Sequence, residues 1–288
     1  MRAALFPGQG IEAGVVLKAL DPLHPLTVQA SEMLGYDLRR RVEQASRRPR
    51  GVMPTALAQP AIFVAGLLSF EKTSDRGEGF SHVLGHSLGE YTALVAAGAM
   101  SFRHGLALVA TRGSAMQKVA SRTPGGMAAV IGLGLHEVEG LADDVGVTVA
   151  NDNSSNQVVI SGEPPALATA AAAVRDAGGR CVLLPIEGAF HSDAMRPAAA
   201  ALSRALFTIE IRNPSIPVVS NITAKPYRSP GEIRRLLERQ LTERVRFRGC
   251  VHYLQRVGVR DFIDIGPGDV VGRIAAADVR SSREPVDV

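Results

Sequence analysis

The chain has 288 residues and a net charge of +4, and 46% of its residues are hydrophobic. That is enough apolar material for one large domain with a smaller insert, and no apolar run reaches the roughly 18 residues that a membrane-spanning helix needs. Aromatic residues make up 5%, Trp is absent and the basic residues are dispersed, which argues against nucleic-acid binding.

The first 120 residues predict short strands between helices. A buried strand over 2–6 is broken at once by Pro7-Gly8-Gln9-Gly10. A helix is expected from Pro25 to just before Gly35, because proline favours the first turn of a helix and glycine its end. The elements expected next are a long apolar helix over 56–71, a surface loop over 72–79, a strand over 81–84, and helices over 87–97 and 101–120.

Residues 124–187 have a different pattern of predicted elements, in the order strand, helix, strand, strand, helix, strand. These six elements are expected at 127–131, 136–144, 147–150, 158–160, 164–177 and 181–184. This is the order of a ferredoxin-like unit. We therefore predict a main α/β domain formed by 1–123 and 188–288, with 124–187 inserted as a small subdomain.

The last hundred residues return to the main domain. Helices are expected over 193–206, 230–241 and 245–257, strands over 216–219 and 261–265, and a short helix and a mobile tail from about 281 at the end. Cys181 and Cys250 lie inside apolar patterns, which predicts free thiols in a reducing cytoplasm rather than a disulfide.

The segment Gly85-His86-Ser87-Leu88-Gly89 matches the G-x-S-x-G pattern of a sharp turn from a strand into a helix. Small residues on both sides let the backbone pass closely, and the serine stands at a helix N-terminus, where the following amide can bind an oxyanion. We therefore predict that Ser87 is a nucleophile. Only two strands precede it, fewer than in an α/β-hydrolase, which argues against that fold itself. The fold class that we predict is α/β, with a large hydrolase-like main domain and an inserted ferredoxin-like subdomain.

A serine nucleophile needs a base, and His191 is the best placed of seven histidines. It lies in a loop between a predicted strand and a predicted helix, where catalytic groups tend to lie. The other histidines fall in helical patterns, at a strand edge or in the serine turn itself. The turn at Pro7-Gly8-Gln9-Gly10 permits a close backbone approach to a ligand, although on spacing alone an ordinary turn is the better explanation.

Together these segments resemble the malonyl-CoA:acyl-carrier-protein transacylase family, which serves fatty-acid and polyketide synthesis. The resemblance covers nearly the whole chain and rests on motifs in a fixed order. They are Phe6-Pro7-Gly8-Gln9-Gly10, Gly85-His86-Ser87-Leu88-Gly89-Glu90-Tyr91, Arg112-Gly113 with Met116-Gln117, Gly126 to Leu133, Asn153-Ser154 with Gln157 to Gly162, Ala189-Phe190-His191-Ser192, Pro217 to Asn221, Gln240-Leu241 and Gly266-Pro267-Gly268.

The resemblance implies a role for each matching residue. Ser87 is acylated, and His191 is its base and later the base for the incoming thiol. The backbone amides of Gln9 and Leu88 form the oxyanion hole, and a backbone carbonyl at Gln240, rather than an acid, orients the histidine. The residues implied to bind substrate are Arg112, His86, Met116, Asn153 and Phe190. Neither a metal nor a cofactor is expected beyond the coenzyme A thioester and the phosphopantetheine of the carrier.

Arg112 is the residue most informative about the substrate. A planar guanidinium can hold a carboxylate through two parallel hydrogen bonds, and a buried one without that carboxylate would be left unpaired. From sequence alone, a solvated helix arginine is the better explanation, and the motif match reverses this. The loop Ala189-Phe190-His191-Ser192 resembles the malonyl-selective form, which favours malonyl over methylmalonyl.

The chain departs from the family pattern at a few positions. Ile11-Glu12 stands where the family usually has Ser-Gln, and Arg244 precedes Val245-Arg246-Phe247 where a proline is common. We interpret the chain as a divergent, free-standing enzyme acting with an acyl carrier protein. The positive charge fits a surface that meets coenzyme phosphates or an acidic carrier, or simply an arginine-rich composition.

Three alternatives stay open: a transferase for methylmalonyl or another extender unit, a proofreading thioester hydrolase on the same fold, and a carrier-docking protein without catalysis. We expect a cytoplasmic monomer with malonyl-CoA and an acyl carrier protein as partners, and neither nucleic acid nor membrane.

Overall fold

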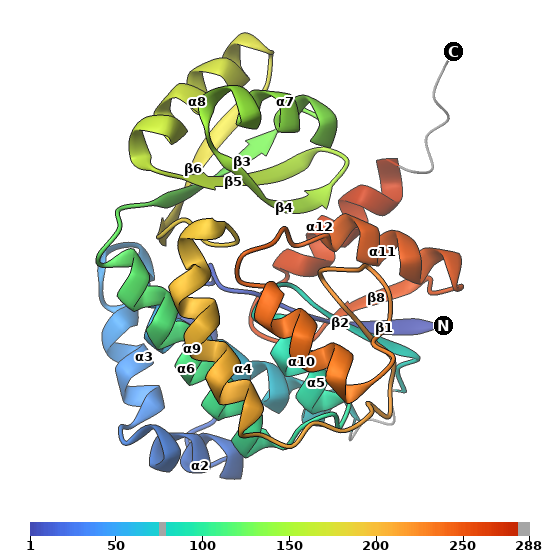
Figure 1. Cartoon of the computed structure of the whole chain (residues 1–288). Coiled ribbons are helices and arrows are strands. Elements are labelled where there is room, and N and C mark those ends of the chain that lie inside the picture. Colours follow the sequence, from blue (N-terminus) through green and yellow to red (C-terminus); the bar gives the residue numbers. More distant parts are fainter. Residues whose placement is uncertain (75–78, 282–288) are drawn as a thin grey trace.

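The computed structural model describes residues 1–74 and 79–281, and it contains two separate sheets (Figure 1). The first sheet is parallel and has the order β7-β2-β1-β8. Its strands are β1 (Arg2–Phe6), β2 (His82–Gly85), β7 (Val218–Val219) and β8 (Asp261–Asp264). Among the residues described before Ser87, β1 and β2 are the only strands, as predicted.

Helices cover both faces of the parallel sheet, which is why β1 is apolar without alternation. Ala4 and Phe6 pack into the large core formed with the N-terminal helices, while Ala3 and Leu5 pack on the opposite side. The helices of the main domain are α1 (Ala13–Ala19), α2 (Pro25–Leu34), α3 (Leu38–Ser46), the 3₁₀ turn η1 (Pro49–Gly51), α4 (Thr55–Ser74), α5 (Gly89–Ala96), α6 (Phe102–Ala120), η2 (Asp193–Met195), α9 (Arg196–Phe207), α10 (Pro230–Arg239), α11 (Phe247–Arg256) and α12 (Val270–Ser281).

The second sheet is antiparallel and confirms the predicted ferredoxin-like order, with strands arranged β4-β5-β3-β6. Its elements are β3 (Gly126–Ile131), α7 (Leu135–Val145), β4 (Thr148–Ser154), β5 (Gln157–Gly162), α8 (Pro164–Asp176) and β6 (Arg180–Glu187). Ala128 and Val130 of β3 face α7 and α8, whereas Met127 and Ala129 face the main domain. The domain limits at 123/124 and 187/188 stay a prediction.

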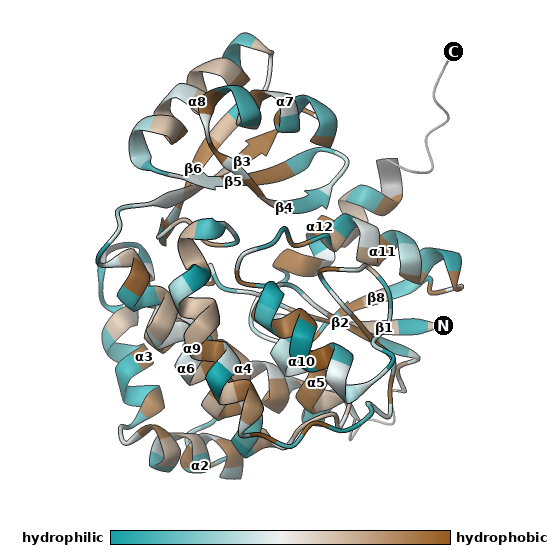
Figure 2. Ribbon diagram, in the orientation of Figure 1, coloured by the Kyte–Doolittle hydropathy of each residue, from teal (hydrophilic) through white to brown (hydrophobic). Residues whose placement is uncertain are grey.

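Two strands of the small sheet, β4 and β6, continue three or more residues beyond their predicted ends. β4 continues through Ser154 because its polar residues are buried and bonded within the fold, although they interrupt the apolar pattern. β6 is an edge strand with several exposed residues, so its pattern is weak at both ends. Figure 2 shows hydrophobic residues along β3 and β5, hydrophilic residues at the end of β4, and both kinds together on helices such as α10.

The C-terminal helix α12 connects the two sheets. The backbone N–H of Ser155 in the small subdomain donates to Asp278 Oδ1 at 2.8 Å. Asp278 is buried, and its carboxylate also lies 2.7 Å from His252 Nε2 and 3.3 Å from Arg248 Nε, both on α11. These contacts hold α12 against β4, where it forms part of the wall of the main cavity. The predicted tail beyond Ser281 and residues 75–78 of the predicted loop lie outside the described residues. At 72–74 the loop prediction is wrong, because α4 continues through Ser74.

Within the described ranges, no helix combines the length and the apolar character that a membrane crossing requires.

Candidate active site

Ser87 stands on a strained turn between β2 and α5. Its φ is 51°, in the left-handed region that residues other than glycine rarely adopt. The turn closes tightly: a Cβ on Gly85 would lie 1.9 Å from the carbonyl carbon of Gly89. A Cβ on Gly89 would in turn lie 2.1 Å from the carbonyl oxygen of Phe6 in β1. Glycine is therefore required at both positions for the serine to reach this corner.

Replacing Gly85 by Ala should prevent the turn from closing, because the new methyl group would meet rigid backbone. We expect a loss of roughly 3 kcal/mol in the free energy of unfolding, measured by denaturant titration, together with loss of fluorophosphonate labelling at Ser87. Gly14→Ala is the matched control, since Gly14 lies within α1 and a Cβ there has no atom within 4 Å. Wild-type stability and labelling in Gly85→Ala would contradict this account.

The side chain of Asn221 holds the serine turn through two hydrogen bonds. The backbone N–H of Ser87 donates to Asn221 Oδ1 at 2.7 Å, and Asn221 Nδ2 donates to the carbonyl of Gly85 at 2.7 Å. Asn221 is fully buried and follows the short strand β7, which pairs with β2. The amide side chain thus bridges the strand end and the nucleophile, and it holds the left-handed conformation in place.

His191 reaches Ser87 from the loop that follows β6. Its Nε2 lies 2.8 Å from Ser87 Oγ, and its Nδ1 lies 2.7 Å from the carbonyl oxygen of Gln240. A carbonyl only accepts, so Nδ1 carries the proton and Nε2 is left to accept from the serine hydroxyl. Burial, and next the positive charge of Arg112, lower the pKa of His191 to about 3. The imidazole is therefore neutral near pH 7, as a base must be.

Arg112 lies on α6 with its guanidinium beside the nucleophile. Its Nη2 donates to Ser87 Oγ at 2.9 Å and to Gln240 Oε1 at 3.1 Å, and its guanidinium carbon lies 5.4 Å from the ring centre of Tyr91. The side chain is only 1% exposed, and within the described part of the chain its Nε has no hydrogen-bond partner. Burial lowers its pKa, but an arginine stays charged at neutral pH. The site therefore holds a buried cation with donor capacity to spare.

Two backbone amides are placed to bind an oxyanion. Gly8 packs directly on the serine turn, since a Cβ there would lie 2.7 Å from the carbonyl oxygen of His86. The side chain of the next residue, Gln9, donates to Thr55 Oγ1 at 2.9 Å. The hydrogen bonds among the described residues leave the backbone N–H groups of Gln9 and Leu88 without an acceptor. Both groups are thus available to a ligand near Ser87.

A cavity of about 510 Å³ leads to Ser87 between the small sheet and the main domain. His86, Ser87 and His191 line it, together with Met127, Ala129 and Leu184 of the small sheet. Val270 and Ile274 of α12 also line it, and the sequence did not suggest them as site residues. The lining is mainly apolar with a few polar side chains, which is typical of a site for an elongated organic ligand.

Three of the predicted substrate-binding residues line this cavity: His86, Asn153 and Phe190. His86 Nε2 lies 2.8 Å from Asn153 Oδ1, so the serine turn is hydrogen-bonded to β4 of the small sheet. Burial lowers the pKa of His86, so its imidazole is also neutral. Neither Arg112 nor Met116 is among the residues that line the cavity, and Met116 lies one turn beyond Arg112 on α6, where its sulfur contacts Gln59 at 3.2 Å. A substrate-binding role for Met116 stays a prediction.

Sequence reasoning gave no role to Asn221 or Glu90, although both lie within the quoted motifs. Both are fully buried and bonded to residues of the site. The signal in the sequence is an acid at the second residue of a helix that is otherwise largely apolar, as Glu90 is in α5. Such an acid is expected to be buried, and a buried acid must be paired.

Comparison with known proteins agrees with this geometry. Residues 25–287 match the model of the acyl transferase domain family. The polyketide biosynthesis protein ThaF of Burkholderia thailandensis is 39% identical over 278 residues, which is 94% of this chain and 24% of that protein. The polyketide biosynthesis malonyl CoA-acyl carrier protein transacylase BaeC of Bacillus velezensis is 37% identical, with 93% of both chains covered.

Among solved structures, the malonyl-transacylase in complex with a type II polyketide synthase acyl-carrier protein, PlMCAT:AntF, superposes with a TM-score of 0.88. It is 33% identical, and the match covers 97% of this chain and 93% of that chain. The strained serine turn, its neutral histidine and these matches over nearly the full length lead to one conclusion: the chain belongs to the acyl transferase domain family, and it is an acyltransferase.

Proposed function

We propose that the protein transfers a malonyl group from malonyl-CoA, through an ester on Ser87, to the phosphopantetheine thiol of an acyl carrier protein. The observation that carries the substrate assignment is the buried guanidinium of Arg112, 2.9 Å from Ser87 Oγ. A carboxylate at the far end of the acyl group would pair with this cation. A plain acetyl group would bury next to it without supplying an acceptor.

The first half-reaction forms the acyl-enzyme. Ser87 Oγ attacks the thioester carbonyl carbon while its proton passes to His191 Nε2. The oxygen of the tetrahedral intermediate receives hydrogen bonds from the N–H groups of Gln9 and Leu88. The carbon–sulfur bond then breaks, His191 returns the proton to the sulfur, and coenzyme A leaves as a thiol.

The second half-reaction reverses these steps with a different thiol. The phosphopantetheine thiol gives its proton to His191 and attacks the ester carbonyl. The bond between the acyl carbon and Ser87 Oγ breaks, and Ser87 regains the proton. The carbonyl of Gln240, bonded to His191 Nδ1, keeps the imidazole in the same tautomer and orientation in both halves. Because its pKa lies below 7, the imidazole is unprotonated when either nucleophile reaches it.

The proposed acceptor is the phosphopantetheine arm of an acyl carrier protein. The relatives named as malonyl CoA-acyl carrier protein transacylases support an acyl carrier protein as the partner. The mainly apolar cavity between the two sheets suits a pantetheine arm. The chemistry derived for Ser87 and His191 uses no metal and no cofactor beyond the thioester and the carrier's arm.

A competition assay tests the substrate and the acceptor together. Malonyl-, methylmalonyl- and acetyl-CoA are offered in equal amounts with a panel of phosphopantetheinylated carrier proteins, and the acylated carriers are quantified by mass. We expect malonyl-carrier as the main product. Free acid released faster than any carrier is acylated would instead assign the chain as a thioester hydrolase, and preferential transfer of acetyl would refute the role of Arg112.

A further inference from the structure

Glu90 is a buried acid that the mechanism above does not use. It lies on α5 directly behind the serine turn and is 0% exposed. Its Oε1 accepts from the backbone N–H of Asn221 at 3.0 Å and from the hydroxyl of Tyr227 at 2.6 Å. Its Oε2 accepts from Gln240 Nε2. Three donors, two from the connection between β7 and α10 and one from Gln240 at the end of α10, thus converge on one carboxylate.

The hydrogen bonds of Gln240 have a single allowed direction. Its Nε2 faces the carboxylate of Glu90 and the backbone carbonyl of Ser87, 2.9 Å away, and both of these groups only accept. Its Oε1 faces Arg112 Nη2, which only donates. The Gln240 amide is therefore oriented by the acceptors on one side, and it presents its oxygen to the arginine as a consequence.

We infer that Glu90 is a positioning residue for acyl-group selectivity: its carboxylate fixes the Gln240 amide, and through that amide it aims the Arg112 guanidinium at the acyl pocket. The inference rests on the proposed malonyl transfer, in which Arg112 binds the acyl carboxylate. Glu90 does not touch the reacting atoms. It acts through Gln240, which also orients His191, and through Asn221, which holds the serine turn.

An uncharged isostere at this position cannot satisfy all three donors. In Glu90→Gln, the new amide has one oxygen and one NH₂ group. If the NH₂ group faces Gln240, two donors meet and the Gln240 amide is driven to flip, so that Arg112 faces an NH₂ group. If the NH₂ group faces Asn221, the backbone N–H there loses its acceptor. A buried unpaired donor is costly in either case.

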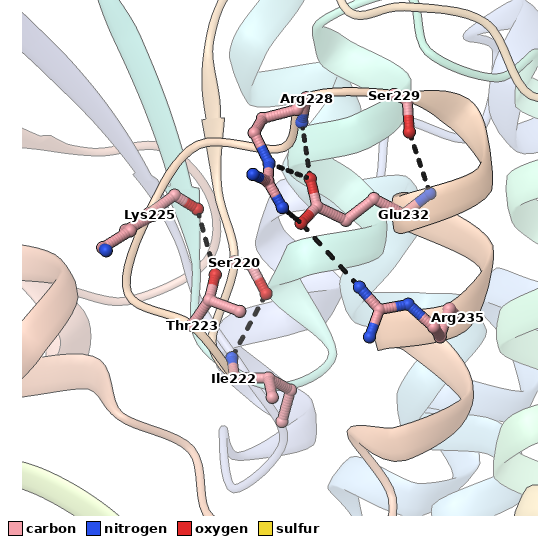
Figure 3. A network of polar contacts seen from close by, with 8 residues as sticks. All are labelled: Ser220, Ile222, Thr223, Lys225, Arg228, Ser229, Glu232 and Arg235. Atoms are coloured by element: carbon pink, nitrogen blue, oxygen red, sulfur yellow. Dashed lines mark hydrogen bonds and ion pairs between the residues drawn. The ribbon is translucent and has the colours of Figure 1, made fainter.

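The helix that precedes Gln240, α10, provides a matched control at its first turn (Figure 3). Glu232, in the first turn of α10, pairs with Arg228 at 2.8 Å, and Ser229 caps that turn. Gln240 follows the opposite end of this helix, about 12 Å away at 1.5 Å per residue. Because Arg228 is largely exposed, its pairing with Glu232 contributes little to stability. Glu232→Gln therefore perturbs the same helix without reaching the Gln240 amide.

The test is the ratio of Ser87 acylation rates with malonyl-CoA and acetyl-CoA, measured by rapid quench and intact mass. We expect Glu90→Gln to lower this ratio about 10- to 100-fold, as for the loss of a hydrogen bond to a charged group, and Glu232→Gln to leave it unchanged. In the double variant Glu90→Gln with Gln240→Leu, the ratio should be no lower than in Gln240→Leu alone. A ratio within twofold of wild type in Glu90→Gln, or multiplicative effects in the double variant, would overturn the inference.

The wild-type protein offers a second measurement. Burial raises the pKa of Glu90 to about 7, against its hydrogen bonds and the charge of Arg112. The other titratable groups that face it are Tyr227, Tyr91 and Cys250. Protonation would give Glu90 an O–H that competes with the Gln240 donor, so the malonyl-to-acetyl ratio should fall between pH 8 and pH 6. A fall of the ratio that persists unchanged in Glu90→Gln, which has no carboxylate to protonate, would contradict the positioning role.

Failure of the inference differs from failure of the proposed function. Absence of any malonyl ester on wild-type Ser87 would remove the function itself. A normal malonyl ester with an unchanged ratio in Glu90→Gln would remove only the role of Glu90.

Discussion

Replacing His191 by Ala should slow acylation of Ser87 by about 10²- to 10⁴-fold, the usual contribution of a positioned general base. The structure leaves no substitute, because among the described residues the only other partner of Ser87 Oγ is Arg112, which cannot accept a proton. Pre-steady-state mass measurements with malonyl-CoA give the rate. His136→Ala on the exposed side of α7 is the control, and it should acylate at the wild-type rate.

The pH dependence of this reaction should separate His191 from Glu90. With a pKa of about 3, His191 stays unprotonated as the pH falls from 8 to 5, so the base itself is not lost in this range. A fall in malonyl acylation centred near pH 7 is instead expected from Glu90, and it should be absent in Glu90→Gln. A loss of activity centred near pH 6.5 that persists in Glu90→Gln would show that His191 titrates at its ordinary pKa, and it would contradict the lowered pKa of this histidine.

Replacing Arg112 by Ala should lower kcat/KM for malonyl-CoA roughly 100-fold or more, because the acyl carboxylate would then enter a buried site without its cation. The effect on acetyl-CoA should be small or favourable, so the preference between the two thioesters should reverse. Arg112→Lys keeps the charge but loses the planar pair of donors, and we expect an intermediate preference. Arg103→Ala, at an exposed position of the same helix, is the control.

An equal loss of kcat/KM with malonyl-CoA and with acetyl-CoA in Arg112→Ala would contradict the substrate assignment. Arg112 would then act on Ser87 alone, through its 2.9 Å contact with Oγ.

Local patterns explain why much of the fold could be predicted. The serine turn is encoded within five residues, and the close approaches at Gly85 and Gly89 are the physical reason that glycine stands there. The βαββαβ order of the small sheet follows from the spacing of apolar residues and short turns. Asn151 to Asn153 obscured the true length of β4, because buried polar residues look like a loop when their partners are unknown.

The hydrogen bonds that hold the serine turn from inside the main domain could not be predicted in the same way. Glu90 is separated along the chain by 131 residues from Asn221 and by 150 residues from Gln240, and the polarity of these three residues matters only once the fold brings them together. Met116 shows the opposite limit. It shares a helix face with Arg112, four residues away, but one turn of about 5.4 Å separates its sulfur, which contacts Gln59, from the guanidinium that contacts Ser87.

The most direct test of the central claim is to incubate the protein with malonyl-CoA and to locate the added mass by intact-protein and peptide mass spectrometry. The account predicts one malonyl group on wild-type protein, carried by the peptide that contains Ser87, lost on addition of a phosphopantetheine thiol and absent in Ser87→Ala. A malonyl adduct that persists in Ser87→Ala, or a wild-type protein that acquires none, would contradict it.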